Sequence, residues 1–197
     1  MTRDTSASNP PEVALIVGGG PGISASCARL FANNGMQVAV AARRPDKPVL
    51  ETLEQELGVR RYPCDAQNPQ AVEQLFQAVA EDLGRPTLVV HNIDGRTGDI
   101  FRKEITEADP ELAQQTLLNS SFSAFLIGQQ AARYMLENEP GATGVRGTII
   151  FTNASAAFKG FPLSGAFAMA SHGKSGLAQS MARELGPKGI HVAHVPI

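Results

Sequence analysis

The chain has 197 residues, of which 43% are hydrophobic and 18% charged, and its formal net charge is −2 with a pI near 6.1. This length suits one domain with a single sizeable core. No run of like charges occurs and the apolar runs are strand-sized, so we expect neither nucleic acid nor a membrane as a partner.

Residues 1–11 lack the apolar segment of a signal peptide and predict a disordered tail. Cys27 and Cys64 form no Cys-x-x-Cys motif, which favours reduced thiols and a cytoplasmic protein. We expect no metal site.

The segment that follows carries the most informative pattern of the chain. Val13–Val17 is apolar and rich in β-branched residues, which predicts a buried strand. Gly18, Gly20 and Gly22 then allow a sharp turn, and a helix begins at Ile23. Such a turn binds the pyrophosphate of a dinucleotide, because glycines let the backbone approach and the helix end offers free N–H groups. Glycine turns also join strands to helices where no ligand binds, and this alternative stays open.

Strands and helices alternate along the rest of the chain. The apolar patterns predict strands at 12–17, 37–42, 59–63, 87–91, 147–152 and 190–195, and helices at 22–33, 47–57, 69–83, 110–138 and 165–185. Asn68 and Asp109 precede prolines as N-caps, and four glycines are predicted to close helices in a left-handed conformation: Gly35, Gly58, Gly84 and Gly186. This alternation predicts an α/β fold with a parallel sheet covered by helices on both faces.

Several motifs occur in order at workable spacing. Val17–Ser24 is similar to T-G-x-x-x-G-[IL]-G but departs from it at both ends, and further matches follow at Cys64-Asp65-Ala66, His91-Asn92-Ile93-Asp94 and Gly186-Pro187-Lys188-Gly189-Ile190-His191-Val192. On these motifs the chain resembles the short-chain dehydrogenase/reductase family from about residue 12 onward. The resemblance implies a Rossmann-type doubly wound parallel sheet of strand order 3-2-1-4-5-6 in a single domain, 12–197. Relatives continue into a substrate-covering segment and a seventh strand, so this chain is expected to be truncated after the sixth strand.

The resemblance also implies a nicotinamide cofactor. In the family, the residue at Asp65 contacts the adenine amino group, and Asn92 matches one asparagine of the N-N-A-G motif. NAD-dependent relatives carry an acidic residue at the end of the second strand, where this chain has Arg43 and Arg44. Since arginine can bind the 2′-phosphate, we expect NADP(H) to be favoured over NAD(H), with Arg43 nearer the strand end. The alternative is a solvated surface pair.

The family's catalytic residues are mostly replaced. Family members use a tyrosine, a lysine four residues later, a serine and an asparagine, but this chain has no Y-x-x-x-K motif. A gap-free match puts Phe167 at the tyrosine position, Ser171 at the lysine position and Ala154 at the serine position. Asn119 alone matches, at the position whose asparagine orders a water in the proton relay. Phenylalanine has no exchangeable proton, so Phe167 cannot act as acid or base.

Other residues can compensate. Lys174 lies one turn beyond Ser171 on the same helix face, from which its ammonium can reach the nicotinamide ribose; the alternative is a surface or dimer-facing lysine. Ser155 can reach a substrate oxygen or cap local backbone. His172 points about 100° around the helix and is a weaker candidate.

The helix at 165–185 is dense in Ala, Ser and Gly. In relatives this helix and the long helix at 110–138 pack against a second subunit, so we expect a homodimer or homotetramer. The alternative is that the small residues accommodate the sheet beneath them.

Three hypotheses remain. The first is an NAD(P)(H)-dependent oxidoreductase with a degenerate catalytic site, acting on a small-molecule carbonyl or alcohol. The second is a catalytically inactive NADP(H)-binding pseudoenzyme that senses or scaffolds. The third is an oligomerising remnant that binds no nucleotide; Val17, Ser24 and Asp94 support it, because they replace the usual residues and Asp94 is acidic. The first is the prediction carried forward.

Overall fold

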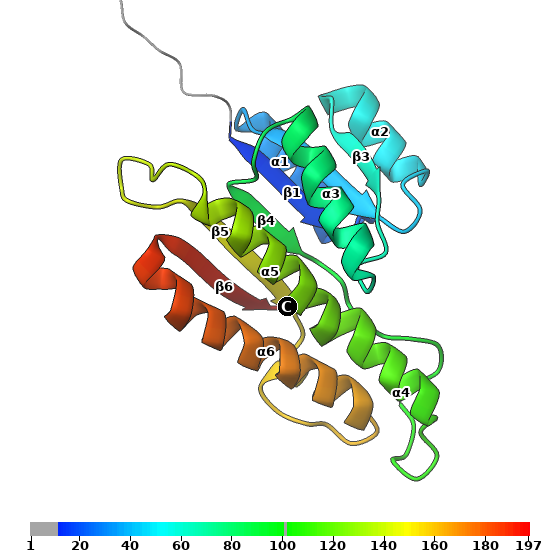
Figure 1. Cartoon of the computed structure of the whole chain (residues 1–197). Coiled ribbons are helices and arrows are strands. Elements are labelled where there is room, and N and C mark those ends of the chain that lie inside the picture. Colours follow the sequence, from blue (N-terminus) through cyan, green and yellow to red (C-terminus); the bar gives the residue numbers. More distant parts are fainter. Residues whose placement is uncertain (1–11, 101) are drawn as a thin grey trace, which may run out of the picture.

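The computed structural model describes residues 12–100 and 102–197, so the predicted disordered tail at 1–11 lies outside the described residues. Six strands form one parallel sheet in the order β3-β2-β1-β4-β5-β6 (Figure 1). They are β1 (Val13–Val17), β2 (Gln37–Ala42), β3 (Arg60–Pro63), β4 (Leu88–His91), β5 (Gly147–Asn153) and β6 (Ile190–Pro196). The predicted α/β fold class, the single domain and the strand order are confirmed.

Six α-helices connect these strands: α1 (Ile23–Asn33), α2 (Pro48–Leu57), α3 (Pro69–Asp82), α4 (Pro110–Leu117), α5 (Ser123–Leu136) and α6 (Gly165–Leu185). Both predicted N-caps are confirmed, since the side-chain oxygens of Asn68 and Asp109 each accept two backbone N–H groups of the first turn. Gly35, Gly58 and Gly84 are left-handed as predicted. Gly186 is not, because α6 continues into a 3₁₀ turn and Gly189 adopts the left-handed conformation instead.

The prediction of one continuous α-helix over residues 110–138 is wrong. A π-helical turn, Leu118–Phe122, separates α4 from α5 and contains Asn119. A π turn inserts one extra residue per hydrogen-bonded ring and often occurs at functional sites. Apolar periodicity does not reveal it, because one inserted residue shifts the helix face only locally.

Alternate residues of β1 enter two separate cores. Val13, Leu15 and Val17 pack toward α3, α5 and α6, whereas Ala14 and Ile16 pack toward α1 and α2. Figure 1 shows these two groups of helices on opposite sides of the sheet. Because β1 is buried on both faces, it is a continuous apolar run with no polar alternation.

The expectation that helices cover both faces of the sheet fails at β5 and β6. Burial alternates over residues 147–151 and 190–193, where one set of residues is buried under α5 and α6 and the other set is partly or fully exposed. Ile150 is half-buried, and Val195 is 42% exposed. Residues of β1, β2 and β4 enter both cores, so helices flank both faces of the sheet there, whereas β5 and β6 are covered by helices mainly on one face. No helix among residues 12–100 and 102–197 is long and apolar enough to span a membrane.

Candidate functional site

The turn after β1 requires a glycine at its first position. Gly18 has φ +105°, and a Cβ atom there would lie 2.2 Å from the carbonyl oxygen of Asn92. Ser24, which departs from the family motif, does not crowd the helix. Its hydroxyl donates to the carbonyl of Gly18 (2.8 Å) and accepts from the Asn92 amide (2.7 Å). Ser24 therefore links the glycine turn to Asn92, the residue directly after β4.

A cavity of about 550 Å³ lies at the carboxyl edge of the sheet, between the ends of β1, β2 and β4; we call it the first cavity. Its position is the switch point, where the strand order reverses and open α/β sheets bind ligands. Its size suits a nucleotide cofactor. Gly18 and Asn92 line it, whereas Gly20, Gly22 and Ile23 are outside its lining.

One end of the first cavity is basic. Arg43 and Arg44 line it as exposed side chains at the end of β2. Lys47 also lines it, and its ammonium donates to the carbonyl of Gly19 (2.6 Å). Sequence reasoning missed Lys47, although its place four residues after Arg43 in the same basic segment was a visible signal.

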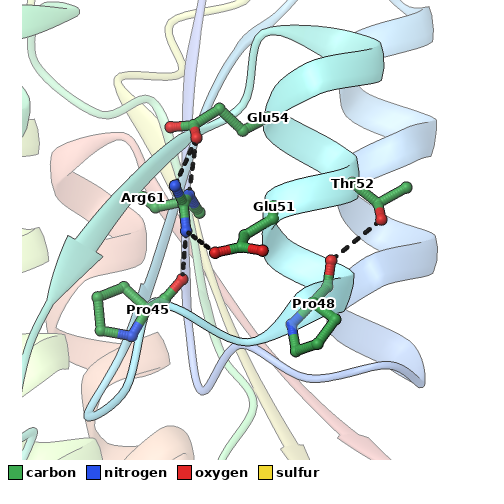
Figure 2. Close-up of polar contacts among 6 residues, drawn as sticks. All are labelled: Pro45, Pro48, Glu51, Thr52, Glu54 and Arg61. Carbon is green, nitrogen blue, oxygen red and sulfur yellow. Dashed lines mark hydrogen bonds and ion pairs between the residues drawn. The ribbon is translucent and has the colours of Figure 1, made fainter.

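A side chain from β3 holds this basic segment in place. Arg61 donates to the carbonyl of Pro45 (2.9 Å) and forms two bonds to one carboxylate oxygen of Glu54 (3.0 and 2.6 Å), and it also lies 3.6 Å from Glu51 (Figure 2). Pro45 follows Arg44 directly. Arg61 therefore fixes the loop between β2 and α2 without lining the cavity itself.

The opposite side of the first cavity carries a chain of amide side chains. Gln115 donates to Gln67 (2.6 Å), Gln67 donates to Asn119 (2.6 Å), and Asn119 donates to the Thr97 hydroxyl (2.7 Å). Asp65, Gln67 and Asn119 line the cavity. The side chain of Asn119 is thus engaged at both its oxygen and its nitrogen.

The π turn presents the backbone of Asn119 to a second group of polar residues. Ser123 donates to the Asn119 carbonyl (2.5 Å), and the Ser123 hydroxyl lies 2.8 Å from Nε2 of His91. His91 is fully buried, and burial together with the nearby positive Lys174 lowers its pKa well below 6.5. A neutral His91 therefore supports Ser123, which lines the first cavity.

Lys174 is buried inside the chain. This contradicts the alternative interpretation of Lys174 as a surface or dimer-facing lysine. The residue is 1% exposed, and its ammonium donates to the carbonyls of Ile93 (2.8 Å) and Thr152 (3.3 Å). Burial lowers its pKa from 10.5 to about 8, partly opposed by the negative charge of Asp94. Its ammonium lies behind Ile93, which lines the first cavity.

Phe167 and Ser155 line a second cavity, of about 240 Å³, that adjoins the first; Asp94 and Arg96 line both. Arg96 contacts Asp94 at 2.5 and 2.6 Å, and its guanidinium lies 5.6 Å from the centroid of the Phe167 ring. The acidic charge of Asp94 is therefore compensated, which removes one argument against nucleotide binding. Arg96 was missed because it lies in a long irregular loop.

The remaining candidates are separated from both cavities. Ser171 is buried, its hydroxyl has no hydrogen-bond partner among residues 12–100 and 102–197, and it lines neither cavity. His172 is exposed and contacts the carbonyl of Ala168. Tyr62 bonds to Asp82 and Tyr134 packs on Phe76, so neither tyrosine replaces the missing one.

Small residues on α6 permit a close approach within the chain. A Cβ atom at Gly173 would lie 2.9 Å from the Ser121 hydroxyl, which donates to the carbonyl of Ala170 (3.0 Å). Part of the Ala, Ser and Gly content of α6 therefore accommodates the π turn of the same chain, an intrachain contact that sequence reasoning did not consider.

Comparisons with known proteins agree with this geometry. A family model described as Enoyl-(Acyl carrier protein) reductase matches residues 18–196. The 3-oxoacyl-[acyl-carrier-protein] reductase MabA of Mycobacterium tuberculosis is 29% identical over 189 residues, which are 94% of this chain and 69% of that protein. The (+)-borneol dehydrogenase 1 of Salvia officinalis is 32% identical over 185 residues, 91% and 66% of the two chains.

The fold is also shared with solved structures. A short-chain dehydrogenase from Rhodopseudomonas palustris superposes with a TM-score of 0.80 at 31% identity, covering 93% of this chain and 82% of that one. The chain spans 61% to 70% of the length of the curated relatives compared. With the parallel sheet, the glycine turn and the family match together, the chain belongs to the short-chain dehydrogenase/reductase family.

Proposed function

We propose that the chain is an NADP(H)-dependent oxidoreductase that acts on a carbonyl or alcohol substrate, with Lys174 in the role of the family's lysine. The observation that carries the proposal is the buried ammonium of Lys174, which donates to the carbonyl of Ile93 at the edge of the first cavity. A buried cation is costly in a protein interior, so its retention favours a functional role.

The lining of the first cavity supports the cofactor part of the proposal. The turn at Gly18 offers backbone close to a pyrophosphate, and Asp65 stands where relatives bind adenine. Arg43, Arg44 and Lys47 gather at the end of β2, where the 2′-phosphate of NADP(H) would need positive charge. This cluster supports NADP(H) over NAD(H).

The chemistry requires few groups from the chain. The bound nicotinamide supplies the hydride. Lys174 would supply positive charge from behind Ile93, at the edge of the first cavity, and its pKa of about 8 leaves it able to give up a proton near neutral pH. Phe167 cannot donate a proton, so Ser155 is the hydroxyl of the second cavity proposed to bond the substrate oxygen. Asn119 holds the π turn in place through the two hydrogen bonds of its side-chain amide, to Gln67 and Thr97.

A second candidate is an NADP(H)-binding pseudoenzyme. It is favoured by Phe167, which is 6% exposed and packs under the Arg96 guanidinium where relatives carry the tyrosine. General acid catalysis typically contributes about 10²–10⁴-fold, so its loss leaves either a slow enzyme or a binding protein.

Calorimetric titration with NADPH and NADH, followed by NADPH oxidation on a panel of carbonyl compounds, tests the proposal. We expect tighter binding of NADPH and slow turnover that falls further in Lys174→Met. Tight NADPH binding without oxidation above background would favour the pseudoenzyme. No binding of either nucleotide would overturn both candidates.

We also propose that the chain pairs with a second copy of itself through α5 and α6. Phe122 and Phe125 stack on each other with ring centroids 6.4 Å apart, yet they are 38% and 43% exposed, and Met169 on α6 is 50% exposed. Exposed aromatic side chains of this kind mark interaction surfaces. Light scattering should show a dimer or tetramer that Phe125→Glu converts to a monomer; a monomeric wild type would contradict the proposal.

A further inference from the structure

The second cavity adjoins the first and is built from three separate segments. The loop after β4 contributes Asp94, Arg96 and Arg102, and the turn after β5 contributes Ser155. The third segment contributes residues 161–164, which lead into α6, and Phe167 in the first turn of α6. Asp94 and Arg96 line both cavities, so a ligand in the second cavity would lie next to one in the first.

One part of the second cavity is apolar. Phe161 and Leu163 are 42% and 46% exposed, which is unusual for large hydrophobic side chains, and Phe167 forms a buried wall. An apolar ligand bound here would remove the apolar surface of these side chains from water, which is favourable in free energy.

The other part is positively charged. Among the described residues, the lining holds two arginines, Arg96 and Arg102, and one acid, Asp94, which gives these groups a formal charge of +1, whereas the whole chain carries −2. The bonds to Asp94 and the cation–π contact with the Phe167 ring orient the guanidinium of Arg96. An oriented guanidinium matches the planar geometry of a carboxylate.

The walls are held in a fixed arrangement. Arg102 (φ +69°) and Leu163 (φ +63°) are the two non-glycine residues with left-handed backbone among those described. The N–H of Arg102 donates to the carbonyl of Leu163 (2.9 Å), so the two unusual conformations support each other across the cavity rim. Residues in such conformations persist where the surrounding structure determines them, and they concentrate at ligand sites.

We propose that the second cavity binds a small carboxylate with an apolar chain, with the carboxylate at Arg96 and Arg102 and the chain against Phe161, Leu163 and Phe167. One consequence of this inference rests on the proposed function: the substrate that the oxidoreductase reduces is an oxo acid. Its ketone carbon would take a hydride from NADPH and its oxygen a proton from solvent, giving a hydroxy acid and NADP⁺. Arg96 is then the residue that selects an anionic over a neutral substrate.

The binding step can be tested without the cofactor and without turnover. Hexanoate and methyl hexanoate carry the same acyl chain and differ in charge, and each is titrated into the whole chain by calorimetry and by NMR. We expect hexanoate to bind more tightly than the ester. Loss of one charged hydrogen-bonding group typically costs about 10- to 100-fold in affinity, so Arg96→Gln and Arg102→Gln should weaken hexanoate by about that factor and leave the ester unchanged.

Arg85→Gln is the matched control, because Arg85 has the same kind of partner (Glu137) and nearly the same side-chain exposure (50% against 49% for Arg96) on a different surface. It should change neither ligand's affinity. Thermal unfolding of each variant verifies the fold, and the comparison of acid with ester in the wild type needs no variant.

The outcomes separate this inference from the proposed function. If the ester binds as tightly as hexanoate, or hexanoate does not bind, the inference falls, while NADPH oxidation with neutral ketones would leave the oxidoreductase standing. If hexanoate binds through Arg96 and no oxo acid or ketone is reduced, the carboxylate site stands and the oxidoreductase falls.

Discussion

The ammonium of Lys174, on α6, donates a 2.8 Å hydrogen bond to the carbonyl of Ile93, which lies just after β4 and 81 positions earlier in the chain. The lysine is almost fully buried, and burial lowers its pKa from 10.5 to about 8. This contact joins the helix that carries the family's catalytic positions to the loop between the two cavities.

The lowered pKa of Lys174 predicts how stability depends on pH. Between pH 8 and pH 10.5 the unfolded chain retains a proton on Lys174 that the folded chain has released, so the free energy of unfolding rises with pH over this window. From pH 7 to pH 10 the gain from this residue should be about 2–3 kcal/mol.

Urea unfolding of wild type and Lys174→Met at both pH values isolates this contribution. Cys64 acts in the opposite direction, because burial raises its thiol pKa to about 11, but its effect cancels in the difference between the two proteins. Lys188→Met, at an exposed lysine, is the control and should show no such difference. Equal pH dependence in wild type and Lys174→Met would contradict a buried, perturbed Lys174.

Phe167→Tyr should increase activity. The residue lines the second cavity beside Arg96, so a hydroxyl there would restore the missing acid, and kcat should rise by about 10²–10⁴-fold. The measurement is NADPH oxidation with a carbonyl substrate. The single change is preferable to pairing it with Ser171→Lys, since Ser171 is buried and a lysine there would place a second cation near Lys174. A fall in activity would show that the native chain uses a different proton donor, and the pseudoenzyme hypothesis would then be wrong.

Arg43→Asp should reverse the preference between the two cofactors. Loss of an arginine–phosphate contact costs about 1.5–3 kcal/mol, or about 10- to 100-fold in affinity for NADPH, and the new carboxylate can accept from the ribose hydroxyl of NADH. Fluorescence titration with both nucleotides measures the ratio. Arg133→Asp, in the last turn of α5 and outside both cavities, makes the same charge change and should leave the ratio as it is. An unchanged ratio in Arg43→Asp would remove Arg43 from the site.

Arg61→Ala should weaken NADPH binding although Arg61 does not line the first cavity. Removal of its bonds to Pro45 and Glu54 releases the loop that carries Arg43, Arg44 and Lys47 (Figure 2). We expect about a 3- to 10-fold loss of NADPH affinity, from ordering the loop on binding, and a smaller loss for NADH. The neighbouring exposed Arg60 provides the control, Arg60→Ala. If both variants behave alike, the loop does not depend on Arg61.

Gly18→Ala and Gly20→Ala separate backbone strain from contact with a ligand. At Gly18 the added Cβ would meet the Asn92 carbonyl in a left-handed backbone, so unfolding should become easier by about 2–4 kcal/mol. At Gly20 the Cβ would point into open space, so stability should change by less than about 1 kcal/mol. A drop in cofactor affinity in the stable Gly20→Ala variant would place the pyrophosphate beside this turn, whereas unchanged affinity would argue against it.

Much of the fold could be predicted from local patterns. Five apolar residues before Gly18 predict a strand buried on both faces, and asparagine or aspartate before proline at positions 68 and 109 predicts helix starts, because each rule depends on residues close together in the chain. The same reasoning could not predict the π turn around Asn119 or the exposed face of β5 and β6, since both depend on what packs against these segments.

The sequence by itself determined the α/β fold, the strand order through the family motifs, the glycine turn, and the absence of a tyrosine from the position of Phe167. Only the tertiary structure decided that Lys174 is buried against Ile93, that Arg96 lies over Phe167, and that Arg61 holds the basic loop. The physical reason is range. Periodicity and capping act over a few residues, whereas burial and the pairing of charges arise where the sheet brings together segments that are far apart in the chain.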